Sequence, residues 1–166
     1  MLSKCEFTPN GTAKSTSVLA FDVGGINNAL LPITDIQFEY TRQGEIRPKM
    51  ELHGSWAGFN KVNAILIHMS FDVIGVSTSD FNSRKRTLNN KFLPSSVTAL
   101  LQVETLGTLK LRFDGDTEDM QAPVTIDGDI SIPYVGPAYS NAQMTWIVPQ
   151  GYFTGVTTPS NIYFPK

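Results

Sequence analysis

The sequence is poor in the residues that bind metal ions and form covalent cross-links. Its 166 residues include one cysteine, Cys5, and two histidines, His53 and His68. A lone cysteine excludes an intramolecular disulfide and a cysteine-rich metal site. The two histidines are the only imidazole ligands in the sequence. We therefore expect a chain that uses no cofactor.

Long apolar runs are missing as well. No stretch is long enough to cross a bilayer, and the start, MLSKCEFTPNGT, lacks the apolar centre of a signal peptide. We expect a protein that is made in the cytoplasm and that has no membrane partner.

Charged residues are also scarce. They make up 17% of the sequence against 41% apolar residues, and the formal net charge is −2. A free monomer usually carries more surface charge, so the shortage suggests surface that partners cover. The negative balance argues against a general attraction to nucleic acid or membranes. The length suits one domain, expected over residues 1–155, with an extended tail over 156–166.

Short runs that alternate apolar and polar residues dominate the sequence, and this period of two predicts strands. The first clear run covers residues 35–40, and a turn at Gln43-Gly44 is expected to lead into a second strand that carries Pro48. Proline lacks the donor that a central strand needs, so this second strand should lie at an edge or carry a bulge. Residues 52–60 are rich in glycine and are interpreted as a loop.

The longest predicted strand covers residues 63–76, and its alternation places one set of residues on a buried face: Ile65, Ile67, Met69, Phe71 and Val73. Two later dipeptides are typical of tight hairpins. Leu106-Gly107 is expected to join strands at 97–104 and 108–113. Asp127-Gly128 is expected to join strands at 124–126 and 130–132. A loop at 133–142 should then precede a last strand with three inward residues, Met144, Trp146 and Val148.

One segment changes its period from two to that of a helix. Ser77, Thr78 or Ser79 can cap it, Asp80 suits its positive end, and Pro94 ends it. The sequence therefore predicts a helix over about residues 79–93 that packs through a narrow apolar stripe, Phe81, Leu88 and Phe92. The whole pattern predicts a mainly β fold, an antiparallel β-sandwich or barrel with one capping α-helix.

Four basic residues of this helix are expected on the face opposite the apolar stripe: Arg84, Lys85, Arg86 and Lys91. A nucleic-acid patch would need interleaved aromatic residues, which this segment lacks. Two interpretations remain. The residues form either a solvated outer face or a contact with the carboxylates of a neighbouring subunit.

A second charged cluster gathers four carboxylates: Asp114, Asp116, Glu118 and Asp119. A helical calcium loop that began at Asp114 would need glycine at its sixth position and glutamate at its twelfth, but Asp119 and Thr125 stand there. We interpret the cluster as an acidic loop tip that holds no metal ion.

Signatures of catalysis are missing from the sequence. His68 lies near Ser70 and Asp72, but no serine stands in the strand-turn-helix context that an activated nucleophile needs. We therefore expect no enzymatic activity. Aromatic residues could instead line the sugar-binding face of a carbohydrate-binding module: Trp56, Phe59, Tyr134, Tyr139, Trp146, Tyr152 and Phe153.

The order of the segments carries a further signal. The strand ILIHMSFDVIG leads into the helix DFNSRKRTLNNKFLP, then into TALLQVETLGTLKLRFDG and finally into AQMTWIVPQGYFTG. This order resembles the N-terminal, ring-forming domain of distal tail proteins of long-tailed bacteriophages. The matching features are Gly75, the helix with Leu88 and Pro94, Gly107-Thr108-Leu109, and Pro149 with Tyr152 and Phe153. The resemblance covers about residues 62–155.

The resemblance implies a structural virion protein whose copies close into a hexameric ring at the tip of the tail. Such a ring joins the tail tube to the baseplate hub or fibre, and DNA passes through it without specific binding. An acidic lining would repel phosphates, so the cluster from Asp114 to Asp119 is a candidate lining. Open strand edges of one copy would be covered by the next. The alternatives are a tail tube subunit of the same phages and a carbohydrate-binding module.

Overall fold

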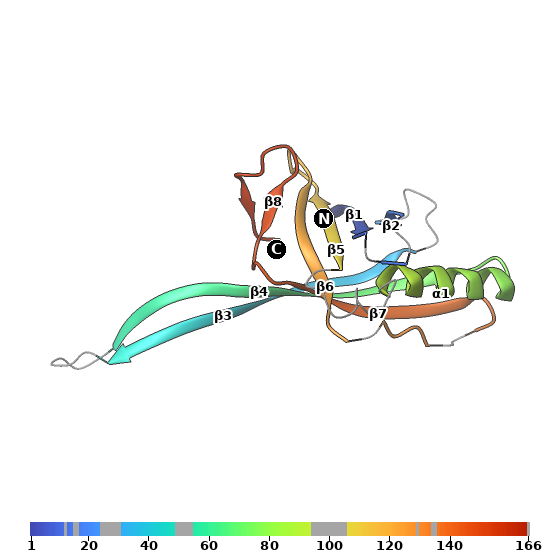
Figure 1. Ribbon diagram of the computed structural model, residues 1–166, viewed down its shortest axis with the longest axis horizontal. Helices are drawn as coiled ribbons and strands as arrows, with labels where there is room; N and C mark the ends of the chain where they lie inside the picture. Colours follow the sequence, from blue (N-terminus) through green and yellow to red (C-terminus); the bar gives the residue numbers. More distant parts are fainter. Residues whose placement is uncertain are drawn as a thin grey trace.

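The computed structural model describes residues 1–11, 13–14, 17–23, 31–48, 55–93, 106–128, 130–133 and 136–165, with the backbone alone described over 42–48 and 55–61. These residues form nine strands and one helix (Figure 1): β1 Leu2–Pro9, β2 Leu19–Phe21, β3 Ile33–Pro48, β4 Ser55–Ile74, α1 Thr78–Phe92, β5 Gly107–Phe113, β6 Met120–Ile126, β7 Tyr139–Val148, β8 Phe153–Gly155 and β9 Ile162–Tyr163. The predicted strand at 97–104 lies outside the described residues, as do His53, Pro94 and Tyr134.

The strands form one antiparallel sheet that folds over into two layers. Its order is β2-β1-β5-β6-β7-β4-β3, with β8 beside β6 and β9 beside β8. Strand β6 belongs to both layers, because its first part pairs with β5 while Thr125 and Ile126 pair with β7. Figure 1 shows β1, β5, β6 and β8 on one side of the long layer made by β3, β4 and β7. The predicted mainly β fold with one helix is confirmed, as an open sandwich and not as a closed barrel.

The core lies between the two layers and uses the alternating faces that the sequence predicts. The five inward residues of β4, from Ile65 to Val73, are each at most 2% exposed. The three inward residues of β7 are buried beside them. The Trp146 ring lies 4.7 Å from Phe7 of β1 and 5.4 Å from Phe92 of α1. Trp146 therefore joins both layers and the helix in one apolar cluster.

Helix α1 begins and ends within one residue of its predicted bounds. The Ser77 side chain accepts a hydrogen bond from the backbone N–H of Asp80 at 3.2 Å, and the Asp80 carboxylate accepts one from Val76 at 3.0 Å. Gly75 lets the end of β4 approach the helix, because a Cβ there would lie 2.7 Å from the Phe81 nitrogen. The helix lies on the same side of β4 and β7 as β1 and β2 (Figure 1), so it completes the cover of the core.

Strands β3 and β4 extend far beyond the sandwich. They have 16 and 20 residues, whereas strands usually have about five or six. Strand β4 pairs with β7 only from Ile65 onward, and its described residues before that point pair only with β3. We call residues 42–48 and 55–61 the arm, and Figure 1 shows it projecting well away from the body.

Two predictions about the arm are wrong. The expected turn at Gln43-Gly44 lies inside β3, which continues with a register shift between Gly44 and Ile46. The expected loop at 52–60 is a strand over its described part, 55–60. A two-stranded ribbon can accommodate glycine at a bulge, so glycine did not mark a reversal here. The prediction for Pro48 is confirmed, because β3 is an edge strand.

Both predicted tight hairpins are wrong too. Gly107 is the first residue of β5, whose two sides are occupied by β1 and β6. Glycine is needed there because a Cβ would lie 2.3 Å from the Thr8 carbonyl oxygen. Gly128 does turn the chain, with φ at 75°. However, Ser131 then pairs with Gln143 of β7 and not with β6.

The end of the chain folds back onto the body. Strand β7 begins at Tyr139, inside the stretch that was expected to be a loop. It is followed by β8 and β9, which pair with each other. The predicted boundary between domain and tail, at residue 155, falls at the end of β8.

Candidate assembly surfaces

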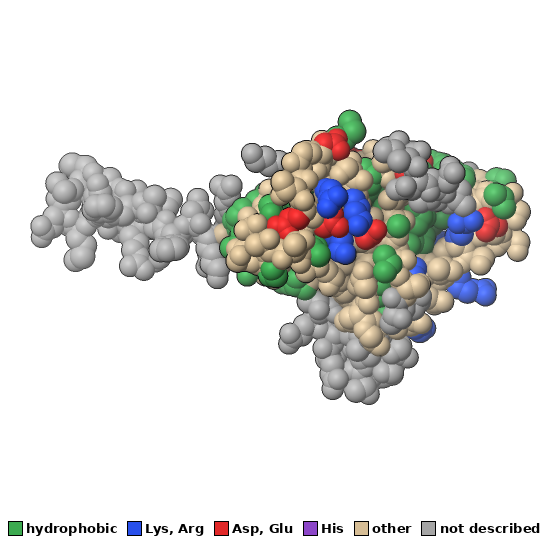
Figure 2. Space-filling view, turned by 90° about the horizontal axis from the view of Figure 1, so that it is seen from above, with side chains coloured by type: hydrophobic (Ala, Val, Ile, Leu, Met, Phe, Trp, Pro, Cys, Tyr) green, Lys and Arg blue, Asp and Glu red, His purple; other side chains and the backbone are tan. Residues whose placement is uncertain are grey.

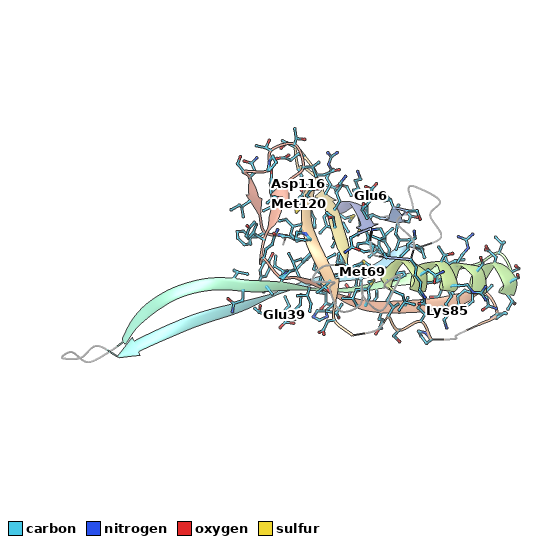
Figure 3. The ribbon with its side chains drawn as sticks, viewed as in Figure 1. Glu6, Glu39, Met69, Lys85, Asp116 and Met120 are labelled. Atoms are coloured by element: carbon cyan, nitrogen blue, oxygen red, sulfur yellow. The ribbon has the colours of Figure 1, made fainter. Side chains whose placement is uncertain are left out.

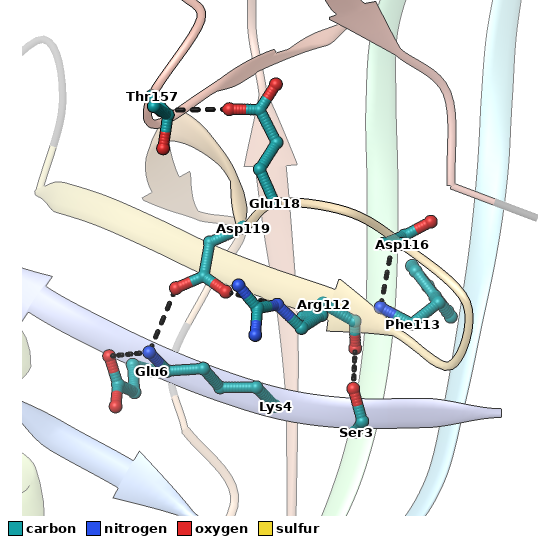
Figure 4. A network of polar contacts seen from close by, with 9 residues as sticks. All are labelled: Ser3, Lys4, Glu6, Arg112, Phe113, Asp116, Glu118, Asp119 and Thr157. Carbon is teal, nitrogen blue, oxygen red and sulfur yellow. Dashed lines mark hydrogen bonds and ion pairs between the residues drawn. The ribbon is translucent and has the colours of Figure 1, made fainter.

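The acidic cluster singled out from the sequence occupies the turn between β5 and β6, and its carboxylates contact groups of the same chain (Figure 4). Asp119 bridges Lys4 of β1, at 2.9 Å, and Arg112 of β5, at 2.7 Å. The hydrogen bond with Asp119 raises the pKa of Lys4. Asp116 accepts a hydrogen bond from the Phe113 backbone N–H at 2.9 Å, which closes the turn.

Glu118 is the most enclosed member of the cluster, at 9% exposed. Its carboxylate accepts four hydrogen bonds: from the N–H groups of Thr157 (2.9 Å) and Thr158 (3.0 Å), the Asn161 side chain (3.1 Å) and the Tyr163 hydroxyl (2.8 Å). The Tyr163 hydroxyl is the largest cause that lowers the pKa of Glu118 from its ordinary value of 4.5, against the opposing effect of burial. Asp114 differs from the other three, because its side chain is 62% exposed.

We expect the protein to lose stability as the pH falls below the ordinary pKa of Glu118. The folded pKa is depressed, so the ionised carboxylate contributes stability above 4.5, and this contribution is lost as the pH falls through the folded value. Urea unfolding between about pH 7 and about pH 3 measures the loss. The Glu118→Gln variant should be less stable at neutral pH, and its stability should depend less on pH. An unchanged dependence in this variant would assign the effect to other carboxylates.

The outer face of the β3-β4-β7 layer holds a second group of carboxylates. Asp35 and Glu39 of β3 alternate with residues that pack on the core, and Asp72 of β4 lies on the same outer side. Figure 3 shows Glu39 and Met69 on opposite sides of this layer. Asp127 lines a shallow hollow on the same face together with His68 and Thr145. We call Asp35, Glu39, Asp72 and Asp127 the acidic face.

The described hydrogen-bond partners on the acidic face are neutral or histidine side chains. The Tyr139 hydroxyl and the Asn141 amide donate to Asp72 at 2.9 and 3.0 Å, and the first of these bonds raises the pKa of Tyr139. Gln37 donates to Asp35 at 2.8 Å. Residues 33–41, 62–74 and 139–148, which make up this part of the layer, contain no lysine or arginine. Within these described residues, no lysine or arginine side chain balances the negative charge.

The outer face of the other layer is different, because it carries ion pairs. Lys4 lies 3.4 Å from Glu6 and also bridges to Asp119, which in turn binds Arg112. Figure 2 shows Lys and Arg side chains interleaved with Asp and Glu on this upper side of the molecule. Among the described side chains, the two outer faces thus differ in their balance of charge.

His68 lies in the middle of the acidic face. Its Nδ1 is 3.0 Å from the Thr145 hydroxyl and its Nε2 is 3.3 Å from the Glu39 carboxylate. Acyl-transfer triads combine the same three groups, but their nucleophile stands on a strained turn beside an oxyanion hole. Thr145 lies instead in the middle of an extended strand. Within the described residues, no three His, Cys, Asp or Glu side chains are grouped to hold a metal ion.

The packing face of α1 contains the predicted apolar stripe and one basic residue. Phe81 and Leu88 are 1% and 2% exposed, and Phe92 is partly buried against the core. Lys91 is 3% exposed, and its Nζ donates to the Ser17 carbonyl at 2.7 Å and to the Ser17 hydroxyl at 2.5 Å. Burial lowers the pKa of Lys91. The expectation that all four basic residues lie opposite the stripe is therefore wrong for Lys91.

The other three basic residues lie away from this packing face. Arg84 forms an ion pair with Asp80 at 2.8 Å, which lowers the pKa of Asp80. Lys85 donates to the Ile132 carbonyl at 3.2 Å. Arg86 is exposed. These three remain candidates for a contact with a neighbouring subunit.

Replacing Lys91 with alanine should destabilise the fold by about 1–3 kcal/mol, because it leaves the Ser17 carbonyl and hydroxyl without this buried donor. Arg86→Ala, on the exposed side of the same helix, should change stability by less than about 0.5 kcal/mol. Urea unfolding of both variants at pH 7 compares them. Equal losses would show that the Lys91 contact contributes nothing beyond helix propensity.

The described members of the aromatic set considered for sugar binding do not gather on an open face. Trp146 and Phe153 are 0% exposed, and Tyr139 donates to Asp72 on the acidic face. Tyr134 and the side chains of Trp56 and Phe59 lie outside the described residues. A carbohydrate-binding surface thus has no support from the described aromatic residues.

The longer of the two terminal strands of the sheet order is β3, at the end opposite the three-residue β2. All 16 residues of β3 except Thr34 and Glu45 pair with β4 on one side, and no described strand lies on the other. An edge of this length presents a row of N–H and C=O groups that can pair with another chain. The sequence indicated an edge through Pro48 but gave no sign of its length, because glycine interrupts the alternation along the arm.

No helix in the described parts of the chain is long and apolar enough to cross a membrane.

No protein-family model matches the sequence, and no curated protein matches it. Solved structures do match in fold. The Dit protein of phage SPP1, described as a paradigm of the hub adsorption apparatus in phages that infect Gram-positive bacteria, aligns with a TM-score of 0.52 and 10% identity, over 76% of this chain and 47% of that one. The phage P2 baseplate in its activated conformation with Ca aligns with a TM-score of 0.58 and 12% identity, over 88% of this chain and 44% of that one.

The same baseplate with Sr gives a TM-score of 0.57 at 11% identity, over 86% of this chain and 43% of that chain. This chain therefore spans less than half the length of each of these three chains. The resemblance found in the sequence is confirmed at the level of the fold: this chain shares its architecture with the Dit hub protein and with a baseplate chain of tailed phages.

Proposed function

We propose that this chain is a structural, non-enzymatic component of a phage tail, and that its copies close into a ring, hexameric in the family that it resembles. The ring would stand at the distal end of the tail, where it joins the tail tube to the baseplate hub or fibre and leaves a channel for DNA. The protein would be made in the host cytoplasm and become part of the virion. The observation that carries the proposal is the arm.

An arm of this kind needs a partner. Its two strands pair only with each other in the described residues, and an isolated two-stranded hairpin is at best marginally stable in water. The free edge of β3 continues from the body along the arm. A second copy that covers this edge would supply the missing contacts. A ring needs the edge of β3 to meet a different surface on its neighbour, because a head-to-tail contact of that kind can close on itself.

The acidic face is the better candidate for the channel lining. Glu118 and Asp119 of the turn first considered are held by donors of their own chain. Asp35 and Glu39 are exposed and belong to the same layer as the β3 edge. If copies join at that edge, their acidic faces form one continuous surface. A surface with unbalanced negative charge repels phosphates and lets DNA pass without binding.

A tail tube subunit is the second candidate, because it too would use the free edge and an acidic bore. The two roles differ in how the rings behave. A ring at the tip should stay a single ring, whereas a tube subunit should stack into long tubes.

Electron microscopy of the purified chain tests the proposal. We expect single closed rings with a central hole. Long stacked tubes would favour the second candidate. Isolated compact particles at all concentrations would contradict both.

A further inference from the structure

The last described residues, 156–165, form a strap that is fastened at two distant points. Near its start, the N–H groups of Thr157 and Thr158 donate to the Glu118 carboxylate at 2.9 and 3.0 Å. At its end, the Pro165 carbonyl accepts a hydrogen bond from the Tyr40 hydroxyl. The Phe164 ring lies 6.4 Å from the Tyr40 ring. The strap thus connects the β5–β6 turn with β3.

Between these two points the strap is held by Asn161 and Tyr163, which also donate to Glu118 at 3.1 and 2.8 Å, and by a short pairing with β8. Its backbone pairing with β8 consists of two residue pairs, Phe153 with Tyr163 and Thr154 with Ile162. Residues 156–162 are exposed, and so is Phe164. Segments with few buried apolar contacts open locally at a low free-energy cost while the rest of the fold stays intact. Glu118 and Tyr40 therefore carry much of the attachment of the strap.

Tyr40 stands where the arm leaves the body. It belongs to the last row in which three strands pair, because Tyr40 pairs with Ile65 and Ile65 pairs with Val148. The next residue, Thr41, begins a register shift. There the Thr41 hydroxyl bonds to both the N–H and the C=O of Ala64, at 3.0 and 2.9 Å. A side chain has replaced part of the backbone ladder, so the ladder is interrupted at this point.

The turn before β8 also reaches this point. A Cβ on Gly151 would lie 2.8 Å from the Val62 carbonyl oxygen, and Gly151 has φ at 75°. The base of the arm is therefore enclosed by two parts of the same C-terminal region: the turn that leads into β8, and the strap that follows it.

We propose that residues 156–165 are a releasable clamp that fixes the base of the arm to the body. The hydrogen bonds to Glu118 are its latch, and the contact of Pro165 with Tyr40 is where it holds the arm. With the latch closed, the arm holds one direction relative to the body. With the latch open, the Tyr40 contact is lost and the hinge at Thr41 is free to adapt to a neighbouring copy. This inference concerns the isolated chain and stands whether or not the ring forms.

Hydrogen exchange followed by mass spectrometry tests this coupling in both directions. Glu118→Ala removes the latch, and Tyr40→Phe removes only the hydroxyl at the other end. A carboxylate that accepts several hydrogen bonds is worth enough that its loss should speed exchange by about tenfold or more. We expect Glu118→Ala to accelerate exchange at the arm base, in residues 40–42 and 62–65, and Tyr40→Phe to accelerate it at Thr157 and Thr158. Asp114→Asn, in the same turn, should change neither.

Each outcome of the exchange experiment either supports or overturns the proposed clamp. Acceleration confined to the neighbourhood of each substitution would overturn the proposal, because it would show two independent anchors and no clamp. Acceleration throughout α1 and β7 in Glu118→Ala would indicate global destabilisation. In that case Tyr40→Phe alone decides, through the exchange of Thr157 and Thr158.

Discussion

A chain without its arm is expected to fold but not to assemble. The change deletes residues 43–61 and joins Arg42 to Val62 through Asn-Gly, a dipeptide that suits a two-residue hairpin between paired strands. Arg42 and Val62 are paired in the native register, so the shortened hairpin keeps the alignment of β3 with β4. The sandwich should stay intact, because the pairing of β4 with β7 begins at Ile65. The deletion removes the arm together with its part of the β3 edge, so the monomer should dominate.

Sedimentation and thermal unfolding together measure this effect. We expect a monomer at every concentration, with a melting temperature within a few degrees of that of the unassembled full-length chain. The Gly136→Ala variant is the control, since a Cβ at Gly136 meets nothing within 4 Å, and it should assemble like the original chain. If the chain without its arm still forms the original assembly, the arm is not part of the interface.

The second large effect concerns DNA. Reversing two charges of the acidic face, by Asp35→Lys with Glu39→Lys, should give the assembled protein an affinity for duplex DNA that the original chain lacks. Every copy in a ring would add two lysines to the same hole, and contacts of lysine with phosphate release counterions. We expect binding tighter by at least about a hundredfold at low salt, falling steeply as salt is raised. Both residues are exposed, so the fold should lose little stability.

The matched control is Asp114→Lys with Asp116→Lys, which changes the net charge by the same amount in the β5–β6 turn. Fluorescence anisotropy of a labelled duplex compares the two variants. If the acidic face lines the channel, the control should bind DNA far more weakly than the Asp35 and Glu39 variant. Equal or tighter binding by the control would indicate that the turn from Asp114 to Asp119, and not the acidic face, lines the channel.

Local interactions explain why the buried face of β4 and the start of α1 could be predicted from the sequence. The buried face of β4 follows from strict alternation, because one side of a strand must match the core throughout its length. The start of α1 follows from Ser77 and Asp80, whose side chains bond to backbone groups within four residues. Both features depend on neighbours in the sequence, so both predictions are confirmed.

The glycine positions show where such reasoning fails. Gly44 and Gly107 were interpreted as turn residues, yet both lie in strands. Gly107 is needed because the ring of Phe7 and the carbonyl of Thr8 occupy the space of a side chain, with a Cβ placed 2.7 and 2.3 Å from them. Glycine permits both a turn and a close approach, and only the folded chain shows which one is used.

The predictions for the charged residues fail for a related reason. Lys91 reaches Ser17, which lies 74 positions away in the sequence. Glu118 binds Tyr163, 45 positions away. The spacing of charges along a helix or turn gives no information about partners at such distances. The acidic face was not predicted for the same reason, since Asp72 and Asp127 lie far in the sequence from Asp35 and Glu39 and gather with them only in the sheet.

The oligomeric state of the purified chain tests the central claim most directly. Sedimentation equilibrium over a wide range of concentration should give one closed assembly of defined size, which becomes more populated as concentration rises. This result is expected because the edge of β3 and the arm have no partner strand within the described chain. A protein that remains monomeric at the highest concentration, with the amides of β3 and the arm already protected from exchange, would contradict the account.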